Sequence, residues 1–165
     1  MSFFVVDTNV PVVANGRSEQ ADPDCVITCI DALTEIRERG IVILDVTLLI
    51  LQEYMGNLSM SGQPGPGDLF MKWLWSVQAD ERHCKQVPIT PSKTDPTSFD
   101  EFPQDVRLMA FDRSDRKFVA VALSSSSMPD VLNAVDSDWA EHFVALSEAG
   151  IKLKFLCPQH VYPRR

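Results

Sequence analysis

Short runs of bulky apolar residues recur along this chain, separated by stretches with helical spacing. The runs predict four strands buried on both faces, at residues 3–6, 41–44, 131–135 and 151–156. Between the first two runs, apolar residues spaced as one face of a helix predict an amphipathic helix that ends at Gly40. A strand–helix–strand unit of this kind predicts parallel neighbouring strands joined by a right-handed crossover.

Helical spacing predicts four further helices, at residues 48–55, from 68 to near 80, 113–124 and 138–149. Thr47 and Asp138 are placed to cap the first and the last of these. Residues 87–105 contain four prolines and only scattered apolar residues. Because ordinary loops are shorter, this segment predicts an irregular insertion near a functional rim. No repeat or shift in composition divides the chain, so we expect a single domain over residues 1–165.

The composition is that of a folded but acidic protein. Of 165 residues, 45% are hydrophobic and 23% are charged, and the net charge is −8. That charge argues against binding nucleic acid through the whole surface, because phosphate binding normally needs a basic face. It does not exclude a nucleic-acid enzyme, because a bound metal ion reverses the local field of the acids that hold it. No apolar run is long enough for a membrane helix and no basic segment precedes the first run, so we expect a cytoplasmic protein without membrane contact.

The four cysteines show no CxxC pair. They are Cys25, Cys29, Cys84 and Cys157. The first two lie four residues apart on the apolar side of a predicted helix, so we expect buried, reduced, structural cysteines.

Four acids occupy positions that the predicted elements would bring to one end of the sheet. Asp7 and Asp136 directly follow buried strands, whose carboxyl ends bind ligands in open α/β sheets. Glu53 and Asp115 lie on the inward-facing stripes of their helices. Each acid alone can be explained as a turn, a cap or a partner of the helix dipole. Asp112 competes with Asp115, which is preferred because it heads the apolar stripe of its helix.

Four carboxylates at one place would repel one another and raise their own pKa values. The usual solution is a divalent cation, and a site made only of oxygen ligands suits Mg²⁺ or Mn²⁺. Such a site meets its substrate through phosphate, and a metal-activated water can attack the phosphorus in line.

The order of these residues resembles the PIN-domain family. The match covers roughly residues 3–156 and consists of four short motifs: Val5-Val6-Asp7-Thr8-Asn9-Val10, then Glu53, then Asp115 with its apolar stripe, then Asp136-Ser137-Asp138-Trp139. The resemblance implies a three-layer α/β/α sandwich with a central, mainly parallel sheet. It also implies a ribonuclease that depends on Mg²⁺ or Mn²⁺ and acts on single-stranded or structured RNA.

The resemblance also implies roles for single residues. The catalytic, metal-binding acids would be Asp7, Glu53, Asp115 and Asp136, with Asp138 as an auxiliary metal ligand and Asn9 as the amide that orients the first acid. Many small relatives are toxins of toxin–antitoxin pairs, so the implied partners include an antitoxin protein and a second copy of the chain as a homodimer.

The chain departs from the family pattern at Ala134, where a Thr or Ser is common two residues before the fourth acid. The missing hydroxyl motivates an alternative, a catalytically weak or inactive member that acts as a binding or scaffold module. A phosphohydrolase with Asp7 as nucleophile is disfavoured, because Asn9 occupies the place of its second acid. The candidates for holding substrate are the cations beside the third acid, Arg113, Arg116 and Lys117. An ordinary solvated cationic face is the alternative for each of them.

Overall fold

Five strands form one sheet in which all neighbouring strands run parallel. The computed structural model describes residues 2–162. The strands are β1 (Ser2–Val6), β2 (Gly40–Asp45), β3 (Cys84–Val87), β4 (Asp130–Asn133) and β5 (Lys152–Phe155). They lie in the order β3–β2–β1–β4–β5, which confirms the predicted α/β class with a central parallel sheet.

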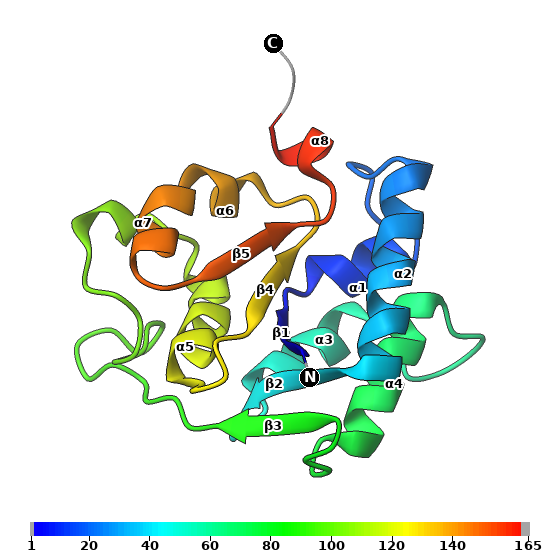
Figure 1. Ribbon diagram of the computed structural model, residues 1–165, viewed down its shortest axis with the longest axis horizontal. Helices are drawn as coiled ribbons and strands as arrows, with labels where there is room; N and C mark the ends of the chain where they lie inside the picture. Colours follow the sequence, from blue (N-terminus) through cyan, green and yellow to red (C-terminus); the bar gives the residue numbers. More distant parts are fainter. Residues whose placement is uncertain (1, 163–165) are drawn as a thin grey trace.

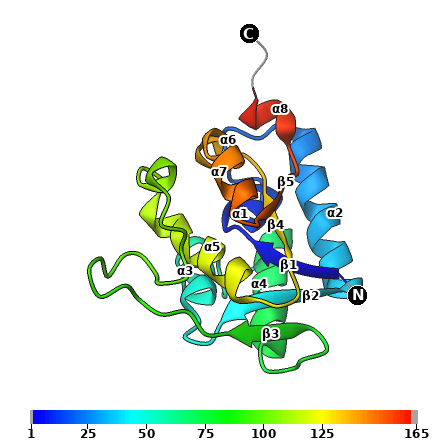
Figure 2. The ribbon, with the colours of Figure 1, turned by 60° about the vertical axis from the view of Figure 1, so that its left-hand side comes forward.

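Helices flank the sheet on both faces. They are α1 (Asn9–Ala14), α2 (Pro23–Arg39), α3 (Leu49–Asn57), α4 (Pro66–Val77), α5 (Arg116–Ser124), α6 (Ser137–Glu141), α7 (Phe143–Glu148) and α8 (Pro158–Val161), with 3₁₀ turns η1 (Val106–Leu108) and η2 (Arg113–Asp115). Figure 1 shows α2 and α4 on one side of the sheet and α5 and α7 on the other, and the turned view keeps α2 and α5 apart (Figure 2). The three-layer α/β/α sandwich is therefore confirmed. Within residues 2–162, no helix is long and apolar enough to cross a membrane.

The order of the strands reverses between β1 and β4. From β1 the chain adds β2 and then β3 on one side, and it later adds β4 and β5 on the other. Val5 pairs with Val131, and the Asp7 backbone N–H donates to the carbonyl oxygen of Leu132 over 3.0 Å. The carboxyl ends of β1 and β4 are thus adjacent, at the topological switch point where open α/β sheets bind ligands.

The apolar pattern does not predict the edge strand β3. Cys84 is buried, but Lys85 and Gln86 are exposed, so the strand contains no apolar run. Pairing with β2 holds it in the sheet, with Val42 opposite Cys84. Polar side chains on an edge strand are typical, because they discourage pairing with other chains.

Helix α3 begins with a different cap from the one predicted. The fully buried carboxylate of Asp45 accepts hydrogen bonds from the backbone N–H groups of Leu49 (2.7 Å) and Ile50 (3.0 Å). The Thr47 hydroxyl donates to the same carboxylate over 2.6 Å and makes no side-chain contact with the helix N–H groups. The prediction that Thr47 caps this helix is wrong, because the end of β2 aims Asp45 at the free N–H groups.

The single helix predicted over 138–149 is two short helices, α6 and α7, that meet at His142. The cap of α6 is Asp136 and not Asp138, because the Asp136 Oδ1 accepts from the Asp138 backbone N–H over 2.9 Å. Strand β4 ends at Asn133, earlier than predicted, so Asp136 lies three residues beyond it and starts the helix.

The segment 87–105 is irregular, as predicted. After β3, its only pairing is a single antiparallel bridge between Pro91 and Phe99 among the described residues. Ile89, Phe99 and Phe102 are buried and anchor the segment to the core. Its acid Asp95 accepts a hydrogen bond from Arg113, which lies two residues before the third predicted site acid.

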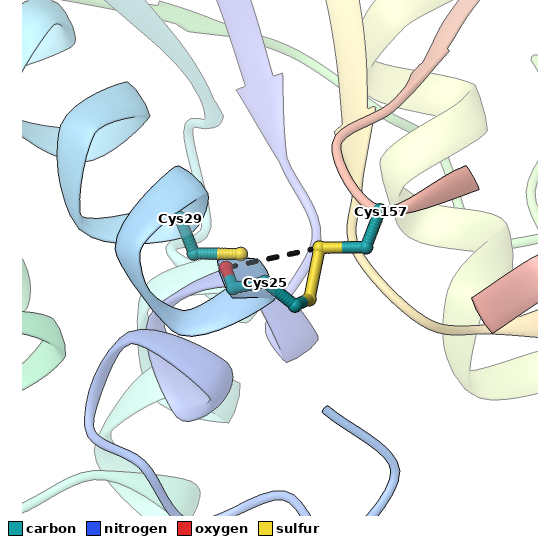
Figure 3. Close-up of side chains that lie close together, drawn as sticks. All are labelled: Cys25, Cys29 and Cys157. Atoms are coloured by element: carbon teal, nitrogen blue, oxygen red, sulfur yellow. Dashed lines mark hydrogen bonds between the residues drawn. A yellow bond between two sulfur atoms is a disulfide. The ribbon is translucent and has the colours of Figure 1, made fainter. Parts of the chain in front are cut away.

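Two of the cysteines form a disulfide, so the prediction of four reduced cysteines is wrong. Cys25, in the first turn of α2, is bonded to Cys157, which follows β5. Figure 3 shows Cys29 one helical turn further along α2, beside this bond; Cys29 and Cys84 are free and buried. The pairing joins residues 132 positions apart in the chain, which spacing along a sequence does not reveal.

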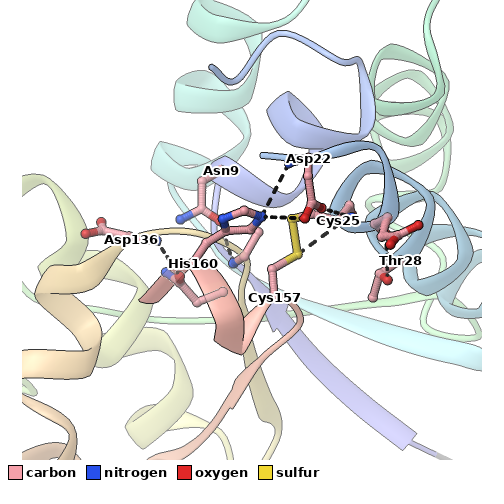
Figure 4. The surroundings of a disulfide bond; sticks show 10 residues. Asn9, Asp22, Cys25, Thr28, Asp136, Cys157 and His160 are labelled. Carbon is pink, nitrogen blue, oxygen red and sulfur yellow. Dashed lines mark hydrogen bonds and ion pairs between the residues drawn. A yellow bond between two sulfur atoms is a disulfide. The ribbon is translucent and has the colours of Figure 1, made fainter. Parts of the chain in front are cut away.

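The disulfide holds α8 against the start of α2. The His160 Nε2 accepts from the Asp22 backbone N–H over 3.3 Å and lies 3.4 Å from the Asp22 Oδ2 (Figure 4). Asp22 in turn caps α2 through the backbone N–H of Cys25. The start of α2 is therefore fixed by one covalent and one polar contact with the C-terminal segment.

Candidate active site

The ends of β1 and β4 position the first two acids. Asp7 is only 4% exposed, and its Oδ1 accepts from the Asn9 backbone N–H over 2.9 Å. Asp136 is held by its own capping bond and by its backbone N–H, which donates to the Asn133 Oδ1 over 3.0 Å. Because β1 and β4 are paired neighbours, both carboxylates lie at one rim of the sheet.

Two helices bring the remaining acids to that rim. Glu53 lies on α3, which the buried Tyr54 fastens to the sheet by donating its hydroxyl proton to the carbonyl oxygen of Val6. Asp115 ends η2 and precedes α5, whose buried side chains pack against the sheet. Asp7, Glu53, Asp115 and Asp136 all line one cavity of about 600 Å³. The structure thus brings together the four acids that the sequence singled out.

Burial and mutual repulsion make this cluster costly when it is fully ionised. Burial raises the pKa of Asp7 to about 7, with further increases from the charges of Asp136 and Glu53, against the lowering effect of the Asn9 N–H. Burial also raises the pKa of Asp115 to about 9, helped by the charges of Asp7 and Asp136. The pKa of Asp136 is raised as well, mainly by burial. A cation in the cavity would relieve all three carboxylates.

One carboxylate oxygen in the cavity has no hydrogen-bond partner among residues 2–162. It is the buried Oδ2 of Asp7, and the other oxygen of the same carboxylate is bonded. Leaving a buried charged oxygen unpartnered is costly, unless a ligand or water completes it. The donors around it are all oxygens, which fits Mg²⁺ or Mn²⁺ and disfavours softer metals.

Glu53 differs from Asp7, because both of its oxygens are engaged. The Thr8 hydroxyl donates to Oε2, and the Lys117 ammonium donates to Oε1 over 2.7 Å. Thr8 follows the first acid directly, so its contact with Glu53 joins the end of β1 to α3. The sequence had shown Thr8 only as a small polar residue at a strand end.

Two of the alternative acids lie outside the cavity lining. The Asp138 Oδ2 accepts from the Asp112 backbone N–H over 3.0 Å, and its Oδ1 lies 3.2 Å from the His142 Nδ1. Asp112 caps η2 through the backbone N–H of Ser114. The geometry therefore favours Asp115 over Asp112 as the third acid and places Asp138 beside the cluster, with its carboxylate engaged.

The three cations that were candidates for binding substrate are all engaged. Arg113 donates to Asp95 and, over 2.8 Å, to the Thr97 hydroxyl. Arg116 is buried, donates to the carbonyl oxygen of Met109 over 2.9 Å and lies over the ring of Phe102. Lys117 points into the acid cluster. Arg113 nevertheless remains exposed, whereas Arg116 is buried and Lys117 is only 13% exposed.

The loop between α1 and α2 supplies a wall of the cavity that sequence reasoning missed. Its lining residues are Arg17, Ser18, Glu19 and Gln20. Arg17 is exposed and forms no ion pair with the described residues, so it is the free cation at the mouth of the cavity. The loop has no periodicity, and its place over the strand ends follows only from the packing of α1.

The amide of Asn9 acts differently from the predicted orienting role. Its backbone N–H holds Asp7, while its side-chain Oδ1 accepts from the Ala134 backbone N–H over 2.8 Å. The side chain therefore ties the end of β1 to the segment after β4. Its Nδ2 is buried and has no partner among residues 2–162. Ala134 is fully buried and offers only its backbone to this network.

Comparisons with protein families, curated proteins and solved structures found no match to this chain. The comparisons therefore assign no family. The parallel sheet establishes the fold class, and any assignment of function depends on the residues of the cavity.

Proposed function

We propose that this chain is a PIN-like ribonuclease that depends on a divalent metal ion and hydrolyses phosphodiester bonds. One observation carries the proposal: Asp7, Glu53, Asp115 and Asp136 line one cavity at the switch point of the sheet, and a buried oxygen of Asp7 has no partner. The sequence resemblance to the PIN-domain family supplies RNA as the substrate class, because cavity geometry alone does not distinguish RNA from other phosphodiesters.

Asp7, Asp115 and Asp136 are the residues that would hold Mg²⁺ or Mn²⁺. When bound, such an ion lowers the pKa of a coordinated water and offsets the charge that develops on phosphate oxygens. The Asn9 backbone N–H fixes one oxygen of Asp7 and leaves the other directed to the ion. Arg17, free at the mouth of the cavity, is suited to a substrate phosphate.

The test is cleavage of a labelled single-stranded RNA with Mn²⁺ or Mg²⁺. Wild-type protein should cleave it, whereas EDTA and the substitution Asp7→Asn should each reduce the rate at least about 100-fold, because a metal ligand is lost. Asp31→Asn, on the exposed face of α2, is the matched control and should retain full activity. Cleavage that persists in EDTA, or equally in Asp7→Asn, would refute the assignment.

A second candidate function is a binding or scaffold module without catalysis. Ala134 favours it, because the hydroxyl common at this position in the family is absent. Here the cavity would bind no divalent ion, and calorimetric titration of the folded protein with Mn²⁺ would show no heat above that of Asp7→Asn. Saturable binding that Asp7→Asn abolishes would exclude this alternative.

A further inference from the structure

Lys117 is a cation built into the acid cluster. Its ammonium donates to the Glu53 Oε1 over 2.7 Å and to the carbonyl oxygen of Ser114. The side chains of Lys117 and Glu53 are only 13% and 23% exposed, so water screens this pair far less than a surface pair.

The carboxylates of Glu53 and Asp7 differ in how many of their oxygens have a hydrogen-bond partner. At Glu53, both carboxylate oxygens are bonded, one to Lys117 and one to the Thr8 hydroxyl. At Asp7, one oxygen is buried without a partner. The chain itself therefore supplies a cation to Glu53, whereas the buried oxygen of Asp7 has no partner among residues 2–162.

We infer that Lys117 takes the place of a second metal ion, so that the cavity binds a single divalent cation, on Asp7, Asp115 and Asp136. This inference depends on the proposed metal site. Two-metal phosphodiesterases place two cations a few ångströms apart across a shared carboxylate cluster. Here an ammonium group, anchored by a backbone carbonyl, occupies the end of the cluster at Glu53. Lys117 is thus a positioning residue that fixes Glu53 and supplies a positive charge to the cavity.

The inference makes a prediction about metal stoichiometry, which does not require activity. Mn²⁺ is titrated into each protein, and the free ion is counted by its electron paramagnetic resonance signal. The wild-type chain should bind one Mn²⁺. Lys117→Met removes the ammonium and keeps the length of the side chain, so this variant should bind two. Adding Glu53→Gln to Lys117→Met should return the count to one, because the double variant no longer has the Glu53 carboxylate that would hold the second ion.

Two controls separate charge from packing. Lys154→Met removes a lysine that is paired with an acid, Asp130, outside the cavity, and it should leave the count at one. Lys117→Arg keeps a positive charge beside Glu53 and should also bind one ion. Circular dichroism verifies that each variant is folded. If Lys117→Met does not fold, a count of two on the wild-type chain would still overturn the inference.

The possible failures are distinguishable. Two Mn²⁺ ions on the wild-type chain, or an equal count for wild type and folded Lys117→Met, would overturn the role of Lys117 and leave the nuclease proposal intact. No binding to the wild-type chain would overturn both. One ion on the wild-type chain and two on Lys117→Met, with no cleavage of RNA, would support Lys117 as the second cation and remove the nuclease assignment.

Discussion

At the scale of single residues, the same residue type serves different purposes at equivalent places. Asp7, Asp45 and Asp136 lie at or shortly after the ends of buried strands, yet Asp45 is a helix cap outside the cavity lining, and Asp136 is both a cap and a lining residue. The sequence pattern predicts that a strand ends in an acid. It does not predict where the carboxylate points, because that depends on which N–H groups the next helix presents.

The raised pKa of Asp7 predicts how stability depends on pH. In the unfolded chain its pKa is 3.8, and in the folded chain it is about 7. The unfolded state therefore loses its proton first, and this group lowers stability as pH rises from about 4 to about 7. In EDTA, Asp7→Asn should gain on the order of 2–4 kcal/mol relative to wild type between pH 4 and pH 8.

Urea unfolding at both pH values measures this difference. Asp31→Asn is the control, because an exposed acid should show the same difference from wild type at each pH. If the difference in unfolding free energy between Asp7→Asn and wild type does not change with pH, burial does not raise the pKa of Asp7 in the metal-free protein.

At the scale of elements, much of the fold could be predicted because the buried strands are fully apolar. The runs ending at Val6 and Leu44 are unambiguous. The strand β3 could not be predicted from the apolar pattern, because Cys84 is its only buried residue. The cavity wall at residues 17–20 was also missed, since a loop without periodicity takes its place only from the packing of its neighbours.

The cap of α3 is an element-scale prediction. Asp45→Ala leaves two N–H groups of the first turn without their acceptor in a buried site, and it should lower the free energy of unfolding by about 1–3 kcal/mol. Thr47→Ala removes a hydroxyl that only donates to Asp45, and it should cost less. Urea unfolding of both variants measures the order. A larger loss for Thr47→Ala would restore Thr47 as the cap.

At the scale of the whole molecule, the disulfide joins the first crossover to the C-terminal segment. Cys157→Ser should lower stability by about 2–4 kcal/mol, because the bond constrains a long loop of the unfolded chain. A reducing agent should destabilise the wild-type protein by a similar amount and leave Cys157→Ser unchanged. Equal urea midpoints for the oxidised and reduced wild-type protein would show that the bond does not form in solution.

The arrangement of the whole sheet is what makes the cavity. Four acids far apart in the sequence meet because β1 and β4 are neighbours and because α3 and η2 approach their carboxyl ends. The central claim is that Asp7, Asp115 and Asp136 hold a divalent ion there. The sequence predicted this site from acids after two strands and on the inward stripes of two helices. It did not predict the contact between Lys117 and Glu53.

The most direct measurement is an anomalous difference map from a crystal of the protein soaked in Mn²⁺. We predict one peak, about 2.0–2.3 Å from the Asp7 Oδ2 and in contact with Asp115 or Asp136, and none beside Glu53 and Lys117. An absent peak in the cavity, or Mn²⁺ bound only elsewhere on the chain, would contradict the metal site and the function proposed from it.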